Sequence, residues 1–318
     1  MRQLPEQTSL AASQSEKPCF DVLIDTDIGD DIDDALALAV ALRSPEIAIR
    51  AITTVSGATQ RRAQLAAHLL HTFERDDIPI AAGLSMPLQY RHRPAGVAQA
   101  AILPNNAPSR IISPLSGPEL IIQTANAYAG RLTLVCIGPL TNVATALTLD
   151  PHLFLAIRKI FMMGGTSSIP LPDWNVRSDA KAAQIVLASG IPVTMLGLNI
   201  TSRCQLRACD IAQLRNDHSP QAQFLSRLLA IWQRHRSRWH ARLPYLHDPL
   251  TIAVLCKPEL FTFQEMTARV LTHGPLRGFM VPRFMDGPIV NAVTDVKVKQ
   301  AREWVMQKLI ETSHTQTT

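Results

Sequence analysis

Short apolar runs alternate along the chain with longer segments that are rich in alanine and leucine. Residues 21–25 read DVLID, a run typical of a buried strand, and residues 33–44 read DDALALAVALRS, which predicts a helix that ends before Pro45. Residues 47–55 are rich in β-branched side chains and predict a second strand, and residues 59–73 predict the next helix. The N-terminal part of the chain therefore predicts the order strand, helix, strand, helix.

The alternation resumes after a loop-rich stretch between residues 83 and 118. Strands are expected at residues 132–137, 157–163, 192–198 and 290–298, and helices at 142–147, 179–188, 221–240, 249–256 and 302–310. This order predicts an α/β fold with a mostly parallel central sheet and helices on both faces. The ligands of such sheets bind beyond the carboxyl ends of the strands, so candidate chemistry is expected in the loops there.

The composition is consistent with the predicted α/β fold. Of the 318 residues, 47% are hydrophobic and 18% charged, as in a globular protein with a large core. No run approaches the roughly 18 apolar residues of a membrane-spanning helix, and the first twenty residues lack the apolar core of a signal peptide. We expect a flexible tail at residues 1–19, a single domain at 20–312, a frayed tail at 313–318 and no membrane association.

Cysteine spacing and charge exclude several classes of protein. The five cysteines are scattered without Cys-x-x-Cys spacing, which argues against a zinc site or a disulfide framework and favours a cytoplasmic protein. The net charge is +5, and three tyrosines offer little for stacking on single strands, so no nucleic-acid partner is expected. A local basic excess is either a solvated helix face or a rim that attracts an anionic partner; it comprises Arg234, His235, Arg236, Arg238, His240 and Arg242.

The strongest chemical signal is the segment DTDIGDDIDD at residues 25–34, which holds six carboxylates in ten residues. So many like charges are unfavourable together unless a cation balances them, and carboxylate oxygens favour Ca²⁺ or Mg²⁺ over zinc. The dipole of the following helix accounts for Asp33 and Asp34 but not for Asp25 and Asp27 at the end of a strand. The segment therefore predicts a site for a divalent cation.

A phosphatase of the haloacid dehalogenase type is an alternative, because those enzymes also carry Asp-x-Asp after their first strand, with the first Asp as nucleophile. The additional acidic residues as far as Asp34 and the motifs farther along the chain fit that class poorly.

The chain resembles the nucleoside hydrolase family, often described as inosine–uridine preferring, in several ordered motifs. These are DTDIGDDIDDALAL from residue 25, CIGPLTN at 136–142, FMMGG at 161–165, DWN at 173–175 followed by AKAA at 180–183, and LHDP at 246–249. Asn142 is also placed to cap a helix. The motifs extend over most of the chain, so the resemblance implies a nucleoside hydrolase-like catalytic domain across residues 20–312.

The resemblance implies hydrolysis of the N-glycosidic bond of purine or pyrimidine ribonucleosides to free base and ribose, with Ca²⁺ as cofactor. Asp27, Asp34 and Asp248 would ligate the Ca²⁺ together with the backbone carbonyl of Ile137. Asp27 would also be the general base for the water that the metal holds. Family members are usually dimers or tetramers, so a homo-oligomer is expected.

The resemblance also implies a set of substrate contacts. Asp33 would bind the ribose 2′-hydroxyl, and Asp173 and Asn175 the other ribose hydroxyls. His247 would lie near the base and help to protonate it as it leaves. Candidates for stacking on the base, or for ordinary packing, are Trp239, His240 and Tyr245.

The chain departs from the family pattern at several points, among them the acidic loop and residue 58. Five residues separate Asp27 from the Asp33–Asp34 pair, where three are usual, so the loop is longer and Asp31 is a further possible ligand. Ala58 stands where an Asn or Asp that contacts the ribose is usual. A metal-binding homologue that acts on a different N-riboside, or with little turnover, is therefore an alternative function.

Overall fold

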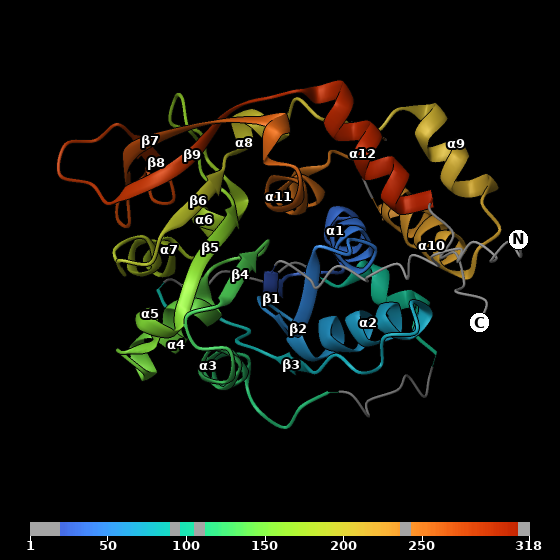
Figure 1. Ribbon diagram of the computed structural model, residues 1–318, viewed down its shortest axis with the longest axis horizontal. Coiled ribbons are helices and arrows are strands. Elements are labelled where there is room, and N and C mark those ends of the chain that lie inside the picture. Colours follow the sequence, from blue (N-terminus) through green and yellow to red (C-terminus); the bar gives the residue numbers. More distant parts are fainter. Residues whose placement is uncertain (1–19, 90–95, 105–111, 236–242, 311–318) are drawn as a thin grey trace, which may run out of the picture.

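The computed structural model describes residues 20–89, 96–104, 112–235 and 243–310, and Figure 1 shows their arrangement. In these residues nine strands form one sheet in the order β3-β2-β1-β4-β5-β6-β9-β7-β8. Their bounds are β1 Phe20–Thr26, β2 Ile47–Thr54, β3 Ile80–Ala82, β4 Leu132–Cys136, β5 Ile157–Met163, β6 Val193–Leu196, β7 Phe261–Val270, β8 Met280–Pro282 and β9 Ile289–Val296. The strands from β3 to β9 in this order run parallel, and β7 and β8 add antiparallel pairs at one edge.

Helices cover both faces of the sheet (Figure 1). They are α1 Asp33–Leu42, α2 Thr59–Thr72, α3 Gly117–Ala127, α4 Thr141–Leu149, α5 Leu153–Ala156, α6 Trp174–Ser178, α7 Ala180–Leu187, α8 Leu198–Thr201, α9 Ala208–Asn216, α10 Pro220–His235, α11 His247–Cys256 and α12 Val298–Ile310, with 3₁₀ turns η1 Ala98–Ile102 and η2 Pro258–Leu260. One core packs α1, α2, α10, α11 and α12 on the sheet, and the other packs α3, α4, α5 and α7 on the opposite face. The predicted fold class, α/β with a mostly parallel sheet covered on both faces, is confirmed.

The alternating pattern did not predict every element. Strands β3, β7 and β8 and helices α3 and α9 were not expected, and the strand expected at 192–198 ends at Leu196. Strand β7 alternates buried and exposed positions beside the edge of the sheet, so it lacks the continuous apolar run of the central strands. None of the helices in the described part of the chain is long and apolar enough to cross a membrane.

The order of the strands reverses at β1, and the acidic loop lies at this point of the sheet. Strand β1 lies between β2 and β4, and the chain first adds β2 and β3 on one side before β4 pairs with the other. Ligands of parallel sheets bind beyond the carboxyl ends of strands where the order reverses in this way. The acidic loop follows β1 and Ile137 follows β4, so both lie at this switch point.

Candidate active site

The acidic loop connects the carboxyl end of β1 to the first turn of α1. Asp33 and Asp34 are the first two residues of α1, and Ile32 before them makes no side-chain cap. Carboxylates are favourable there because the first backbone N–H groups of a helix are unpaired and carry the positive end of its dipole. Thr26 donates a hydrogen bond from Oγ1 to Asp34 Oδ1 over 2.5 Å, which fixes one oxygen of that carboxylate.

Asp248 brings another carboxylate to the same point from the C-terminal part of the chain. It lies in the first turn of α11, which packs against α1. One oxygen from each of Asp33, Asp34 and Asp248 lies within 4.8 Å of the other two, and the residues are only 5%, 4% and 4% exposed. The structure therefore brings two of the predicted metal ligands together and adds Asp33, for which a ribose contact was predicted.

The electrostatics of this cluster favour a bound cation. Burial raises the pKa of each of Asp33, Asp34 and Asp248 well above its ordinary value, and repulsion between the neighbouring carboxylates raises these pKa values further. A divalent cation reverses both penalties, since it supplies opposite charge where water is excluded. Three buried carboxylates with converging oxygens are the hard donor set that Ca²⁺ or Mg²⁺ takes.

Asp27 lies outside this group of three but lines the same cavity. Burial raises its pKa, an effect that the positive charge of Arg62 opposes. The loop after β4 comes close to Asp27, because a Cβ on Gly138 would lie 3.0 Å from Asp27 Oδ1 and 2.7 Å from Val55 Cγ1. A glycine at 138 thus allows the ends of β1 and β4 to approach each other.

Ile137, Asn175 and Asp173 form another part of the cavity wall. Asn175 donates from Nδ2 to the carbonyl oxygens of Ile137 and Met163, over 3.0 and 3.2 Å. Asp173 caps α6, since its Oδ1 accepts the backbone N–H of Val176 over 3.0 Å, and burial raises its pKa to about 6. These bonds hold the predicted ribose-binding residues in place at the carboxyl ends of β4 and β5.

His247 lies next to Asp248 at the start of α11. Its Nδ1 is 2.7 Å from Thr201 Oγ1, and its ring centroid is 5.4 Å from that of Tyr245. The two contacts fix the plane of the imidazole at the edge of the cavity. Of the three predicted stacking candidates, Tyr245 contacts this histidine, whereas Trp239 and His240 lie outside the described residues.

One cavity of about 770 Å³ collects every residue predicted for catalysis, metal binding or ribose binding. The lining residues are Asp27, Asp30, Asp31, Asp33, Asp34, Ile137, Met163, Pro172, Asp173, Trp174, Asn175, Leu198, His247 and Asp248. Asp31, predicted as a further possible ligand, is among them. Ala58 is exposed and precedes α2.

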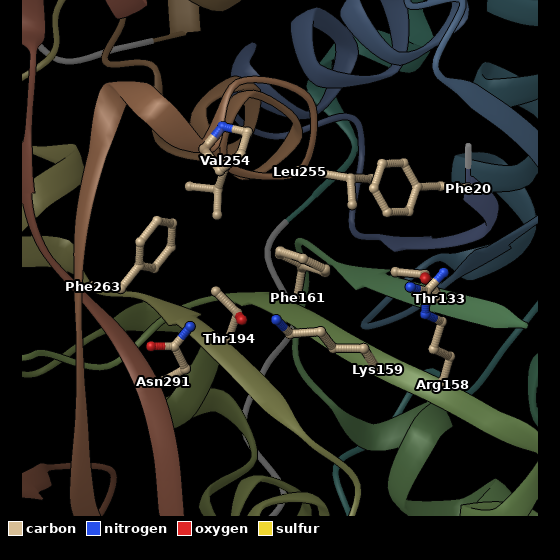
Figure 2. Close-up of a pocket in the computed structure, with 11 residues that line it drawn as sticks. Phe20, Thr133, Arg158, Lys159, Phe161, Thr194, Val254, Leu255, Phe263 and Asn291 are labelled. Carbon is tan, nitrogen blue, oxygen red and sulfur yellow. The ribbon is translucent and has the colours of Figure 1, made fainter. Parts of the chain in front are cut away.

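A second cavity, of about 330 Å³, lies on the α11 face of the sheet near the amino ends of β4, β5 and β6. Figure 2 shows Lys159 and the aromatic rings of Phe161 and Phe263 among the residues that line it. None of the described residues that line this cavity is acidic, in contrast to the first.

Sequence reasoning missed a buried network behind the acidic loop. Asp25 accepts hydrogen bonds at Oδ1 from Thr53 Oγ1 over 2.6 Å and from Asn142 Nδ2 over 2.8 Å. Asn142 also donates to the carbonyl of Thr54 and accepts from the backbone N–H of Leu84. Asn142 therefore ties together three strand ends instead of capping α4, and its only sequence signal was its place in a motif that follows a strand.

The described fold and cavity have clear relatives in sequence. The family described as inosine-uridine preferring nucleoside hydrolase matches residues 22–306 of the chain. The probable uridine nucleosidase 2 of Arabidopsis thaliana is 32% identical over 320 residues, which cover 91% of this chain and 97% of that protein. The pyrimidine-specific ribonucleoside hydrolase RihA of Salmonella paratyphi A is 36% identical over 270 residues, which cover 80% of this chain and 85% of that protein.

Solved structures give the same picture. The plant nucleoside hydrolase PpNRh1 matches with a TM-score of 0.84 at 27% identity and covers 93% of this chain and 100% of its own. A purine-preferring ribonucleoside hydrolase from Gardnerella vaginalis matches with a TM-score of 0.81 at 26% identity and covers 91% of this chain and 98% of its own.

Proposed function

The chain belongs to the inosine-uridine preferring nucleoside hydrolase family, and we propose that its acidic cavity holds a Ca²⁺ ion and hydrolyses the N-glycosidic bond of ribonucleosides. Ribonucleoside hydrolysis is the activity that the family and the names of the relatives support. The observation that carries the mechanism is the convergence of Asp34, from the first helix, with Asp248, from α11, in one buried cluster.

The proposed ligands of the cation are Asp27, Asp34, Asp248 and the carbonyl of Ile137. The carbonyl already accepts a hydrogen bond from Asn175, but a carbonyl oxygen has two lone pairs and has capacity for a second partner. When bound, the Ca²⁺ would lower the pKa of a water molecule and orient it toward the sugar. Asp33 lies close enough to the other carboxylates to serve either the cation or the ribose 2′-hydroxyl.

The chain's own residues would supply the acid–base chemistry. Asp27 accepts a proton from the attacking water, whose oxygen forms the new bond to C1′ as the bond from C1′ to the base nitrogen breaks. His247 donates a proton to the departing base, and we assign Nε2 as the donor atom because Nδ1 already contacts Thr201 Oγ1. Direct attack by water on the face opposite the base predicts inversion at C1′.

Binding and charge stabilisation complete the proposal. Asp173 and Asn175 would hold the remaining ribose hydroxyls, at the wall that their hydrogen bonds already fix. Positive charge develops on the ribose as the base departs, and preorganised carboxylates around the sugar stabilise that charge. The proposed assembly is a homo-oligomer, either dimer or tetramer, which light scattering of the purified protein tests.

The testing experiment measures free ribose after incubation with uridine, cytidine, inosine and adenosine, with Ca²⁺ or with excess chelator. We expect ribose release from at least one ribonucleoside, dependent on Ca²⁺ and lost in Asp27→Ala. Uridine is the first substrate to test, because the curated relatives are named for uridine or pyrimidines. Ca²⁺ binding without ribose release from any of the four would contradict the proposed substrates and favour a different N-riboside. Release of phosphate from esters would favour the phosphatase.

A further inference from the structure

We propose that Arg62 is a positioning residue that holds the lengthened acidic loop in its active shape and thereby places Asp27; this inference rests on the proposed function. Arg62 lies on the buried face of α2 with Leu65, Ala66 and Leu69, and only 1% of its surface is exposed. Arginine is almost never fully buried unless it is paired. A buried guanidinium directly behind a cluster of carboxylates therefore calls for a specific role.

Every nitrogen of the guanidinium is bonded to one of two strand-end loops. Nε donates to the carbonyl of Ser56 over 2.7 Å, and Nη2 pairs with Asp30 Oδ2 over 2.7 Å. Nη1 donates to the carbonyl of Ile28 over 2.9 Å and also to the carbonyl of Asp27. Arg62 thus joins the loop after β1 to the loop after β2 and fixes the main chain of Asp27 itself.

The other side of the lengthened loop is held by the η1 turn. Gln99 donates from Nε2 to the carbonyl of Asp31 over 2.6 Å, and its backbone N–H donates to the carbonyl of Gly29 over 3.0 Å. Gly29 has φ +125°, and a Cβ there would lie 2.3 Å from Val97 Cγ1. The loop therefore passes between α2 and η1, and these contacts use its carbonyls from Asp27 to Gly29 and that of Asp31.

This arrangement gives the loop carbonyls a partner other than the cation. Because Arg62 binds the carbonyls of Asp27 and Ile28, the carboxylates remain the groups of this loop that face the cavity. Arg62 also supplies a permanent positive charge that acts on Asp27, Asp30 and Asp34, and its ion pair balances the charge of Asp30.

Lysine cannot reproduce these contacts. A guanidinium is a planar fork whose donors reach several acceptors in fixed directions, whereas an ammonium is a compact point charge. Arg62→Lys keeps the charge and loses the fork, and Arg62→Met loses both. The matched control is Arg61→Met, since Arg61 is the neighbouring exposed arginine and donates only to Gln64 Oε1, over 3.1 Å, among the contacts seen.

The test measures Ca²⁺ affinity by titration calorimetry, kcat and KM for ribose release, melting temperature, and amide hydrogen exchange of residues 27–34. Groups that orient metal ligands typically change affinity or activity by about 10–100-fold, so we expect a loss of that order in Ca²⁺ affinity and kcat for Arg62→Met. We expect a smaller loss for Arg62→Lys, little change in KM, and faster amide exchange in the loop for both. Arg61→Met should match the wild type in all measurements.

Asp30→Asn keeps the backbone contacts of Arg62 and removes only the ion pair, so its effect should be smaller than that of Arg62→Met. Folded Arg62→Lys or Arg62→Met with wild-type Ca²⁺ affinity and wild-type loop exchange would overturn the inference, even if the melting temperature fell. If the wild type released no ribose, the proposed function would fail, and the affinity and exchange measurements would still decide the role of Arg62. If Arg62→Met did not fold, Arg62→Lys and Asp30→Asn would carry the test.

Discussion

The acidic cavity and the cavity beside α11 differ in how deeply their charged groups are buried. The larger cavity, at the carboxyl ends of β1 and β4, gathers the buried carboxylates of Asp33, Asp34 and Asp248. In the smaller cavity the ammonium of Lys159 lies 4.9 Å from the centre of the Phe161 ring, a favourable contact within the protein itself (Figure 2). The smaller cavity carries its positive charges on the exposed Arg158 and the half-buried Lys159, whereas the larger one gathers fully buried carboxylates that repel one another.

Buried like charges, more than volume, mark the larger cavity as the functional one. Volume alone does not distinguish an active site, since any protein surface has hollows. The larger cavity is built at an electrostatic cost from segments more than 200 residues apart in sequence, and a bound cation removes that cost. Each prediction below therefore contrasts a change in the larger cavity with a change that leaves it intact.

The largest effect is expected for Asp27→Asn. This variant keeps the shape of the side chain but cannot accept a proton, so kcat for ribose release should fall by about 10²–10⁴-fold, the range typical of acid–base groups. Calcium affinity is measured in parallel, because Asp27 is also a proposed ligand. Activity within a few fold of the wild type would exclude Asp27 as the base.

The next effect is expected for Asp248→Asn. An amide is a weaker cation ligand than a carboxylate, so Ca²⁺ affinity measured by calorimetry should fall by at least about 100-fold, the upper end for groups that only orient ligands. Asp295→Asn, at an exposed residue paired with Arg203, serves as the control and should bind Ca²⁺ like the wild type. Unchanged affinity in Asp248→Asn would separate the C-terminal carboxylate from the metal site.

Removal of the metal should destabilise the protein more at higher pH. Folding raises the pKa values of Asp33, Asp34 and Asp248, so the metal-free fold holds protons that the unfolded chain releases above its ordinary carboxyl pKa of 3.8. The stability of the metal-free protein therefore falls as pH rises above this value. The stabilisation of the fold by Ca²⁺ should therefore increase as pH rises. At a Ca²⁺ concentration of roughly 100 times the Kd, we expect the melting temperature to rise by about 5 °C. A calcium effect that is larger at pH 5 than at pH 8 would contradict this.

The smallest effect is expected for Lys159→Met, in the second cavity. Substitutions away from packed or catalytic features usually change stability by less than about 0.5 kcal/mol, and kcat and Ca²⁺ affinity should stay within about twofold. The measurement sharpens the comparison, because a large loss of activity would show that the second cavity takes part in the reaction.

The hydrophobic pattern of the sequence predicted the helices and strands that have continuous apolar runs. Strand β5 has the predicted bounds, and α1 begins at the predicted Asp33, because both combine a clear pattern with full burial. Strand β7 was missed, since its half-exposed pattern depends on its neighbours in the sheet. The local sequence pattern is sufficient to predict the central strands, whereas strands near the edge of the sheet also depend on tertiary contacts.

The site was predictable to a different degree. The acidic loop follows from charge density alone, whereas the partnership with Asp248 depended on resemblance, because no local pattern links two segments so far apart. The burial of Arg62 was missed, although its helical spacing from Leu65, Ala66 and Leu69 places it on the apolar face of α2. All but one of its partners are backbone carbonyls, and a carbonyl is present whatever the side chain of the residue, so the sequence does not reveal them.

We expect one divalent cation to be held by carboxylates from both the acidic loop and α11. A crystal grown with Mn²⁺ tests it most directly, because the anomalous scattering of manganese locates the ion without reference to activity. We predict one peak in the larger cavity, about 2.0–2.6 Å from oxygens of Asp27, Asp34 and Asp248, as expected for a hard cation with carboxylate ligands. A peak elsewhere, or one that contacts the loop but not Asp248, would contradict the account.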